Sequence, residues 1–150
     1  MSIEEDILQR QFESEYHRLH VNILYTASWL NGKLSEALDE YDLSPEQFNV
    51  LRILKGANKQ VNLKYISERL VNKQSNTSRL IDKLFAKKMV ERKTSKEDRR
   101  NVEISISTFG STIINQASES VKKLEVQLNG IKAKEAKEVS DALDRFRKSN

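Results

Sequence analysis

The sequence contains no cysteine, only one proline and only four glycines. The absence of cysteine excludes disulfides, cysteine-ligated zinc and thiol-based redox switching. Because few residues break helices, long helices can run uninterrupted. No apolar run approaches the ~20 residues that cross a bilayer, and residues 1–6 lack the basic and apolar regions of a signal peptide. We therefore expect a cytoplasmic protein that does not interact with a membrane.

Charge is distributed unevenly along the 150 residues, although the net charge is only +4. Residues 60–101 hold twelve basic and five acidic side chains, a net charge of +7, whereas residues 1–45 hold three basic and nine acidic ones, a net charge of −6. A basic segment between more acidic ends is typical of a protein that faces a polyanion. The alternative is an ordinary solvated charged surface.

Helical periodicity dominates the first third of the chain. Apolar residues recur at three- and four-residue steps over residues 5–41, which predicts one long helix. A second helix is expected after Ser44, which can act as an N-cap, with Pro45 in the first turn and Gln47 completing a capping box. Gly56 is expected to end that helix.

Two shorter helices follow in the basic segment. Asn62 can cap the first, and the second is predicted over residues 73–85, with no glycine in the turn between them; this arrangement predicts a helix-turn-helix. A helix in the major groove of DNA needs short polar and basic side chains on its outward face, with apolar residues behind. The candidate DNA-binding residues of this helix are Lys73, Gln74, Ser75, Asn76, Ser78, Arg79 and Lys83. The alternative is an amphipathic surface helix without a ligand.

The period then changes to that of strands. Residues 89–93 and 102–107 are short and β-prone, and the second segment alternates apolar and polar residues. They predict a hairpin with a charged tip, followed by a helix that Thr108 can cap. The candidate DNA-binding residues of this tip, the wing, are Lys96, Asp98, Arg99 and Arg100. An arginine there suits a narrow minor groove, although an isolated arginine-rich turn is usually a solvated loop.

Further helices are predicted over residues 110–128 and 132–148. Together with residues 5–41 they carry more apolar surface than a lone winged helix can cover. Burial between the terminal helices of two chains in a two-fold dimer accounts for this surface; packing within one chain is the alternative. A two-fold dimer would place its recognition helices ~34 Å apart and read a pseudo-palindromic site.

Three runs of sequence carry a family resemblance: Leu43-Ser44-Pro45-Glu46-Gln47-Phe48-Asn49-Val50-Leu51, the run from Gln74 to Leu84, and Asp98-Arg99-Arg100-Asn101-Val102. The chain resembles the MarR (multiple antibiotic resistance regulator) family of transcription factors. The resemblance implies a homodimer that binds a palindromic operator, usually as a repressor released by a small ligand or by oxidation. It also implies that Asp98 and Arg100 are the wing pair. Cysteine-based peroxide sensing is excluded here.

The expected architecture is therefore mainly α with a small β-hairpin wing. Residues 43–108 form the winged helix-turn-helix, within which residues 62–108 read DNA, and residues 1–42 and 109–150 supply dimerisation helices. The expected partners are double-stranded DNA, a second copy of the chain and a small-molecule effector, without a cofactor.

Candidate residues for the effector pocket are His17, His20, Tyr25, Trp29 and Arg52. Two histidines three residues apart suit a metal, but no third ligand is evident, and they are more often surface or interface residues. Two aromatic residues four apart are more often core or interface residues. The sequence shows no phosphate-binding glycine loop or catalytic triad, so we do not expect an enzyme. The stronger alternative is a winged-helix protein–protein adaptor, against which the basic segment and the arginine-bearing wing argue.

Overall fold

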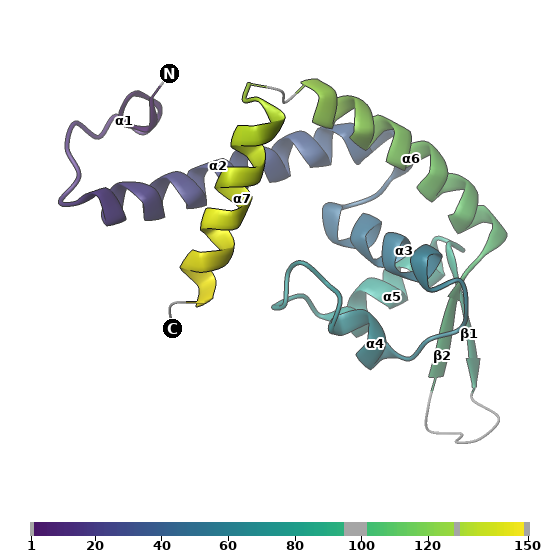
Figure 1. Cartoon of the computed structure of the whole chain (residues 1–150). Helices are drawn as coiled ribbons and strands as arrows, with labels where there is room; N and C mark the ends of the chain where they lie inside the picture. Colours follow the sequence, from purple (N-terminus) through teal and green to yellow (C-terminus); the bar gives the residue numbers. More distant parts are fainter. Residues whose placement is uncertain (1, 95–101, 128–129, 149–150) are drawn as a thin grey trace.

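The computed structural model describes residues 2–94, 102–127 and 130–148. The first elements are α1 (Ile3–Asp6), α2 (Glu15–Leu38), the short 3-10 helix η1 (Asp39–Tyr41), α3 (Pro45–Ala57), α4 (Leu63–Ser67) and α5 (Thr77–Ala86). They are followed by β1 (Val90–Thr94), β2 (Val102–Ile106), α6 (Thr108–Gln127) and α7 (Ala133–Lys148) (Figure 1). The expected mainly helical fold with one small hairpin is confirmed. Within these ranges no helix has the length and apolarity needed to span a membrane.

The long helices α2 and α6 pack against each other and lead into a group formed by α3, α4, α5 and the hairpin. Figure 1 shows the hairpin pointing away from α1, α2 and α7. The two parts are joined at η1, where the Tyr41 and Ser120 hydroxyl oxygens lie 2.8 Å apart. Helix α3 also packs against α2 and α6, so the helix-turn-helix is attached to the two long helices through η1 and α3.

The hydrophobic core lies where α3, α5, α6 and β2 meet. Its fully buried large side chains are Leu38, Val50, Leu51, Leu54, Ile66, Ile81, Leu84, Ile104 and Ile114. Burying each such side chain stabilises the fold by about 1.5–3 kcal/mol before conformational entropy is counted. Because this core includes the inward faces of α5 and β2, the candidate DNA-binding elements are held by it directly.

Helix α3 begins as the sequence predicts. The Ser44 hydroxyl accepts a hydrogen bond from the Gln47 backbone N–H at 3.2 Å, and the Gln47 side chain accepts from the Ser44 N–H at 3.3 Å. Pro45 occupies the first turn, where its missing N–H has no partner to lose. The predicted stop at Gly56 is wrong: α3 continues to Ala57, and Asn58 caps it in the left-handed conformation with φ 49°.

The prediction of one helix over residues 5–41 is also wrong at its N-terminal end. The chain leaves the helical conformation at Leu8, which has φ 55°, and α2 starts only after Ser14, whose hydroxyl accepts from the His17 N–H at 3.1 Å. A salt bridge holds the short α1 against α2: the Glu4 Oε1 and Arg18 Nε atoms are 2.6 Å apart. Apolar periodicity continues through this segment, but a side-chain cap at Ser14 sets the helix boundary.

The hairpin is antiparallel, with Val90 opposite Ile106 and Thr94 opposite Val102. Val61 adds a further bridge to it, because its N–H and carbonyl both bond to Ile104, at 2.9 and 2.8 Å. This bridge fixes the middle of β2 to the segment that leads into α4.

The start of α6 is pressed against the hairpin. The Ser107 hydroxyl accepts from the Gly110 N–H at 2.9 Å, so Ser107 caps α6 and the predicted cap at Thr108 is one residue late. A Cβ atom at Gly110 would lie 2.0 Å from the Met89 carbonyl oxygen. Only glycine allows the helix to approach the strand this closely.

Large apolar side chains remain exposed on the terminal helices. Those on α2 and α7 are Tyr16, Leu19, Leu24, Tyr25, Trp29, Leu30, Val139 and Phe146. Apart from Asp141 and Leu143, which are half-buried, every described residue of α7 is exposed. We call this set of side chains the terminal apolar surface.

Candidate nucleic-acid interface

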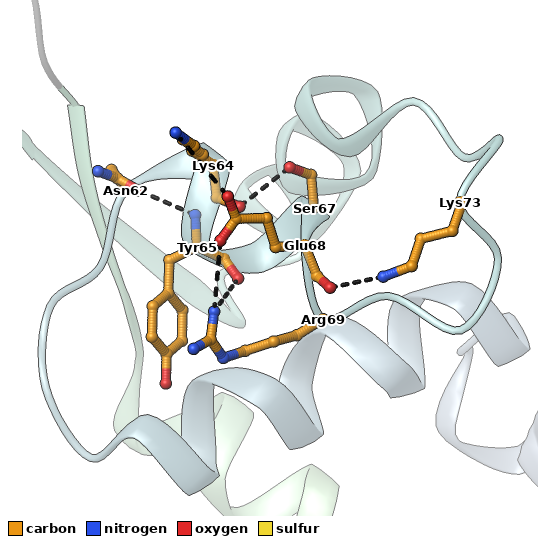
Figure 2. Close-up of polar contacts among 7 residues, drawn as sticks. All are labelled: Asn62, Lys64, Tyr65, Ser67, Glu68, Arg69 and Lys73. Atoms are coloured by element: carbon orange, nitrogen blue, oxygen red, sulfur yellow. Dashed lines mark hydrogen bonds and ion pairs between the residues drawn. The ribbon is translucent and has the colours of Figure 1, made fainter.

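Helix α4 is the first helix of the helix-turn-helix, and its start is fixed by Asn62. The Asn62 Oδ1 atom accepts from the Tyr65 N–H at 2.9 Å, as the sequence predicts (Figure 2). Ile66 is completely buried and attaches α4 to the core. The helix ends after a single turn beyond its cap, so the following turn begins at Glu68.

Figure 2 shows that the exposed side of α4 has its own network of contacts. The Arg69 guanidinium lies 3.5 Å from the centre of the Tyr65 ring and donates to the Tyr65 carbonyl at 3.1 Å. The Glu68 carboxylate lies 3.8 Å from Arg69 and 3.9 Å from Lys64. Sequence reasoning missed this cluster; its signal is an i, i+4 pairing of an aromatic with an arginine and of a lysine with a glutamate.

Residues 73–76 precede the recognition helix rather than forming its first turn, which corrects the predicted range of 73–85. Helix α5 starts at Thr77, because the Asn76 side chain accepts from the Arg79 N–H at 3.0 Å. Asn72 shapes the turn by accepting from the Gln74 N–H at 3.1 Å. Asn72 and Asn76 therefore bend the chain by side-chain capping, without a glycine.

The three candidate DNA-binding residues in the turn before Asn76 differ in their exposure to solvent. Lys73 and Gln74 are exposed, whereas Ser75 is half-buried. The Lys73 ammonium donates to the Glu68 carbonyl at 2.5 Å (Figure 2), which ties it back to the end of α4.

Helix α5 has one buried apolar face and one exposed polar face. Ile81 and Leu84 are buried in the core, whereas Ser78, Arg79 and Lys83 are exposed. Together with the turn, the exposed face offers hydroxyl, amide and cationic groups on one helix. Such groups can hydrogen-bond base edges and phosphates.

Helix α5 is tied to the hairpin through Arg92 on β1. Its guanidinium donates to the Asp82 carboxylate and lies 4.9 Å from the centre of the Phe85 ring. Both partners are on α5, one helical turn apart. Sequence reasoning missed Arg92, because nothing local in the sequence shows that a strand residue reaches a helix ten residues earlier.

The candidate wing residues Lys96, Asp98, Arg99 and Arg100 lie outside the described residues. The structure describes the strands that lead to them, up to Thr94 and from Val102 onward.

A cavity of about 420 Å³ lies behind the helix-turn-helix, between α2, α3, α6 and the turn that precedes α5. Its wall consists of Leu30, Asn31, Leu34, Pro45, Glu46, Phe48, Asn49, Arg52, Leu70, Val71, Asn72, Ser75, Val121, Leu124 and Glu125. Most of the contact surface is apolar, with one arginine and two glutamates among the charged groups. Arg52 was predicted for an effector pocket, and its guanidinium lies 6.0 Å from the Phe48 ring centre.

The other candidate pocket residues lie elsewhere on α2. His17 packs edge-on against Phe12, with ring centres 5.4 Å apart, and His20 is exposed. Tyr25 and Trp29 belong to the terminal apolar surface. These four residues do not line the cavity, and across the described ranges no three histidine or acidic side chains are placed to hold a metal ion.

Comparison with known proteins agrees with the fold. Residues 43–102 match the model of the MarR family. A MarR family transcriptional regulator from Silicibacter pomeroyi is 26% identical over 90% of this chain and 94% of its own, with a TM-score of 0.76. A MarR-like transcription regulator from Bacillus cereus is 21% identical over 89% and 96%, with a TM-score of 0.79.

The organohalide-sensing regulator RdhR-CbdbA1625, solved with 2,4-dichlorophenol bound, is 21% identical over 93% of this chain and 86% of its own, with a TM-score of 0.84. A search among curated proteins finds no significant match. Residues 43–102 are thus a MarR-family region, and the chain as a whole has the fold of MarR-like transcription regulators.

Proposed function

We propose that the chain is a homodimeric, sequence-specific transcriptional repressor that binds a palindromic operator and releases it when a small molecule binds. The observation that carries this proposal is the exposed polar and basic face of α5, with Ser78, Arg79 and Lys83. Helix α5 packs against β1 of the hairpin, and the sequence between the two strands includes Arg99 and Arg100. A helix fits the ~12 Å major groove, and arginines at a hairpin tip suit the minor groove.

Charge supports DNA as the partner. Residues 60–101, which contain α4, α5 and the hairpin tip, carry a net charge of +7. Lysines and arginines that neutralise phosphates release counterions, so affinity depends steeply on salt. An adaptor that binds another protein has no need to concentrate positive charge on these elements.

The terminal apolar surface supports a dimer. Trp29 on α2 and Phe146 on α7 are 46% and 50% exposed. A two-fold interface covers the same patch on both chains at once. Such a dimer would also place its two helix-turn-helix units ~34 Å apart, the length of one turn of DNA. Because the two units are related by a two-fold axis, the DNA site they bind must be palindromic.

The cavity supports control by a small molecule. It lies between the long helices and the turn that leads into α5, and its wall is largely apolar. The similar organohalide-sensing regulator was solved with 2,4-dichlorophenol bound. A largely apolar molecule that fills this cavity in the present chain would contact both the turn and α6, and so could change how α5 is presented.

Selection of bound sequences from a random duplex pool tests the proposal. We expect a palindrome with half-sites one helical turn apart, bound by the dimer with an affinity that falls steeply as salt rises. Arg79→Ala and Arg100→Ala should weaken binding without unfolding the protein, whereas Lys59→Ala, which replaces an exposed lysine before α4, should bind as the unchanged protein does. Absence of duplex binding even at low salt would refute DNA recognition and favour the adaptor.

A further inference from the structure

Asn49 reaches from α3 to the turn that precedes the recognition helix. Its side-chain Oδ1 accepts a hydrogen bond from the Val71 backbone N–H at 3.0 Å. The two residues are 22 positions apart, so the bond joins separate elements rather than neighbouring residues. It is placed one residue after Leu70, which is only 3% exposed, while Val71 is 88% exposed. The chain thus leaves the core and turns outward at this bond.

The hydrogen bonds of the turn are otherwise local. Asn72 bonds to the Gln74 and Ser75 N–H groups, and Asn76 bonds to the Arg79 N–H. These contacts shape the turn but do not fix its position on the rest of the fold. Among the described residues 70–76, the bond to Asn49 is the one hydrogen bond that comes from outside α4, the turn and α5.

Packing in the core holds the turn at Leu70, but not at the residues that follow. Val71, Asn72 and Ser75 line the cavity, and so does Asn49. Where an interior is filled, close packing resists displacement of a segment; here about 420 Å³ of space lies behind the turn instead. The bond at Val71 therefore restrains the part of the turn that follows Leu70 and that core packing does not reach.

We propose that Asn49 is a positioning residue for DNA recognition: by holding Val71 beside the cavity, it sets the position of the turn from which α5 starts. This rests on the proposed function, because it assigns to Asn49 an effect on how DNA is read. Asn49 itself does not lie on α5 or the hairpin, so its effect acts through the turn.

Asn49→Leu and Asn49→Asp separate the bond from the shape of the side chain. Leucine keeps a similar size but has no acceptor, whereas aspartate keeps an oxygen that can accept from Val71. Asn31→Leu is the matched control, because Asn31 lines the same cavity from α2 and makes no described bond to the turn. The measurements are Val71 amide hydrogen exchange, the urea midpoint, and the ratio of affinities for the tightest selected duplex and a scrambled duplex of equal length.

We expect Asn49→Leu to speed Val71 exchange and to lower the affinity ratio, each on the order of five-fold for the loss of one hydrogen bond. The urea midpoint should stay close to that of the unchanged protein, since the bond lies at the surface. Asn49→Asp and Asn31→Leu should keep both the exchange rate and the ratio; the ratio cancels the uniform repulsion that a new carboxylate exerts on phosphates.

Unchanged Val71 exchange in Asn49→Leu would overturn the contact, and an unchanged affinity ratio, or the same loss in Asn31→Leu, would overturn the positioning role. If the unchanged protein bound the two duplexes equally well, the proposed function would be refuted. The proposed role of Asn49 in DNA recognition would then be refuted as well. Val71 exchange would then still show whether Asn49 holds the turn.

Discussion

The guanidinium of Arg92, on β1, lies 4.9 Å from the centre of the Phe85 ring on α5. The same guanidinium donates to the Asp82 carboxylate, so one strand residue contacts two residues of α5. The hairpin and α5 are therefore linked on the surface as well as through the core. This link can be broken without entering the core, because Arg92 is about one-third exposed.

Arg92→Gln should remove both contacts. We expect the free energy of unfolding to fall by about 1 kcal/mol, since a partly exposed ion pair and a partly exposed cation–π contact each contribute little in water. Urea unfolding measures the change, and a double-mutant cycle with Phe85→Leu isolates the ring contact. Lys93→Gln, at the next and exposed position of β1, is the control; an equal loss there would show that charge alone matters.

Gly110→Ala should destabilise the fold strongly. The added Cβ would lie 2.0 Å from the Met89 carbonyl oxygen, so α6 must move away from the hairpin. Overpacking of this kind costs about 1–3 kcal/mol or more. Gly56→Ala is the matched control, because a Cβ there meets nothing within 4 Å and alanine stabilises a helix by up to about 1 kcal/mol over glycine. Thermal unfolding should shift in opposite directions for the two variants; shifts in the same direction would contradict the geometry.

Ser44→Ala should weaken the start of α3. The hydroxyl satisfies the Gln47 N–H at 3.2 Å, and loss of such a cap costs about 0.5–2 kcal/mol. Urea unfolding provides the measurement. Ser140→Ala, whose hydroxyl donates to the Ala136 carbonyl within α7, should change the midpoint far less, and a comparable loss there would argue against a capping effect.

Phe146→Asp should prevent the proposed dimer from forming. A carboxylate placed on the terminal apolar surface would be buried without a partner in a two-fold interface. Because both chains carry the substitution, the interface would bury two such charges. Sedimentation analysis should then find monomers at concentrations where the unchanged chain is dimeric. Ser140→Asp adds the same charge elsewhere on α7 and should remain dimeric; a monomeric control, or a dimeric Phe146→Asp, would place the interface elsewhere.

The hydrogen bond from Arg18 lowers the pKa of Glu4 from 4.5 to about 2. Because the folded pKa is below the ordinary value, the contribution of this pair is fully present above pH 4.5 and is lost as the pH falls toward 2. Carboxyl chemical shifts should show Glu4 still ionised at about pH 3.5. Arg18→Gln should return the titration midpoint toward 4.5; a midpoint near 4.5 in the unchanged protein would show that α1 is not held to α2.

Local chemistry explains which features could be predicted from the sequence. The caps at Ser44 and Asn62 were predicted correctly because each is decided by a side chain and a backbone N–H three residues apart. The break near Leu8 was missed because the apolar spacing continues through it. The start of α5 was placed too early because Asn72 and Asn76 can both cap, and the sequence does not show which one begins a helix.

The rest of the site depends on contacts between elements. Asp82 and Arg92 meet only because the core brings α5 and β1 together. The acceptor that holds Val71 comes from Asn49 on another helix. Likewise the cavity is lined by four parts of the chain, so the residues around it share no spacing that a sequence pattern could reveal. Of the residues predicted for an effector pocket, only Arg52 lines it.

The side chains that cap the N-terminal ends of α3, α4 and α5 affect the electrostatics of this region. Ser44, Asn62 and Asn76 are all uncharged caps. An aspartate in place of Asn76 would bond the same N–H and would interact more favourably with the positive end of the α5 dipole. It would also place a negative charge on the side of the molecule that carries Arg79 and Lys83. The neutral amide leaves the partial positive charge of the first turn uncompensated, so the backbone of α5 adds to the field that its cationic side chains present to an approaching phosphate.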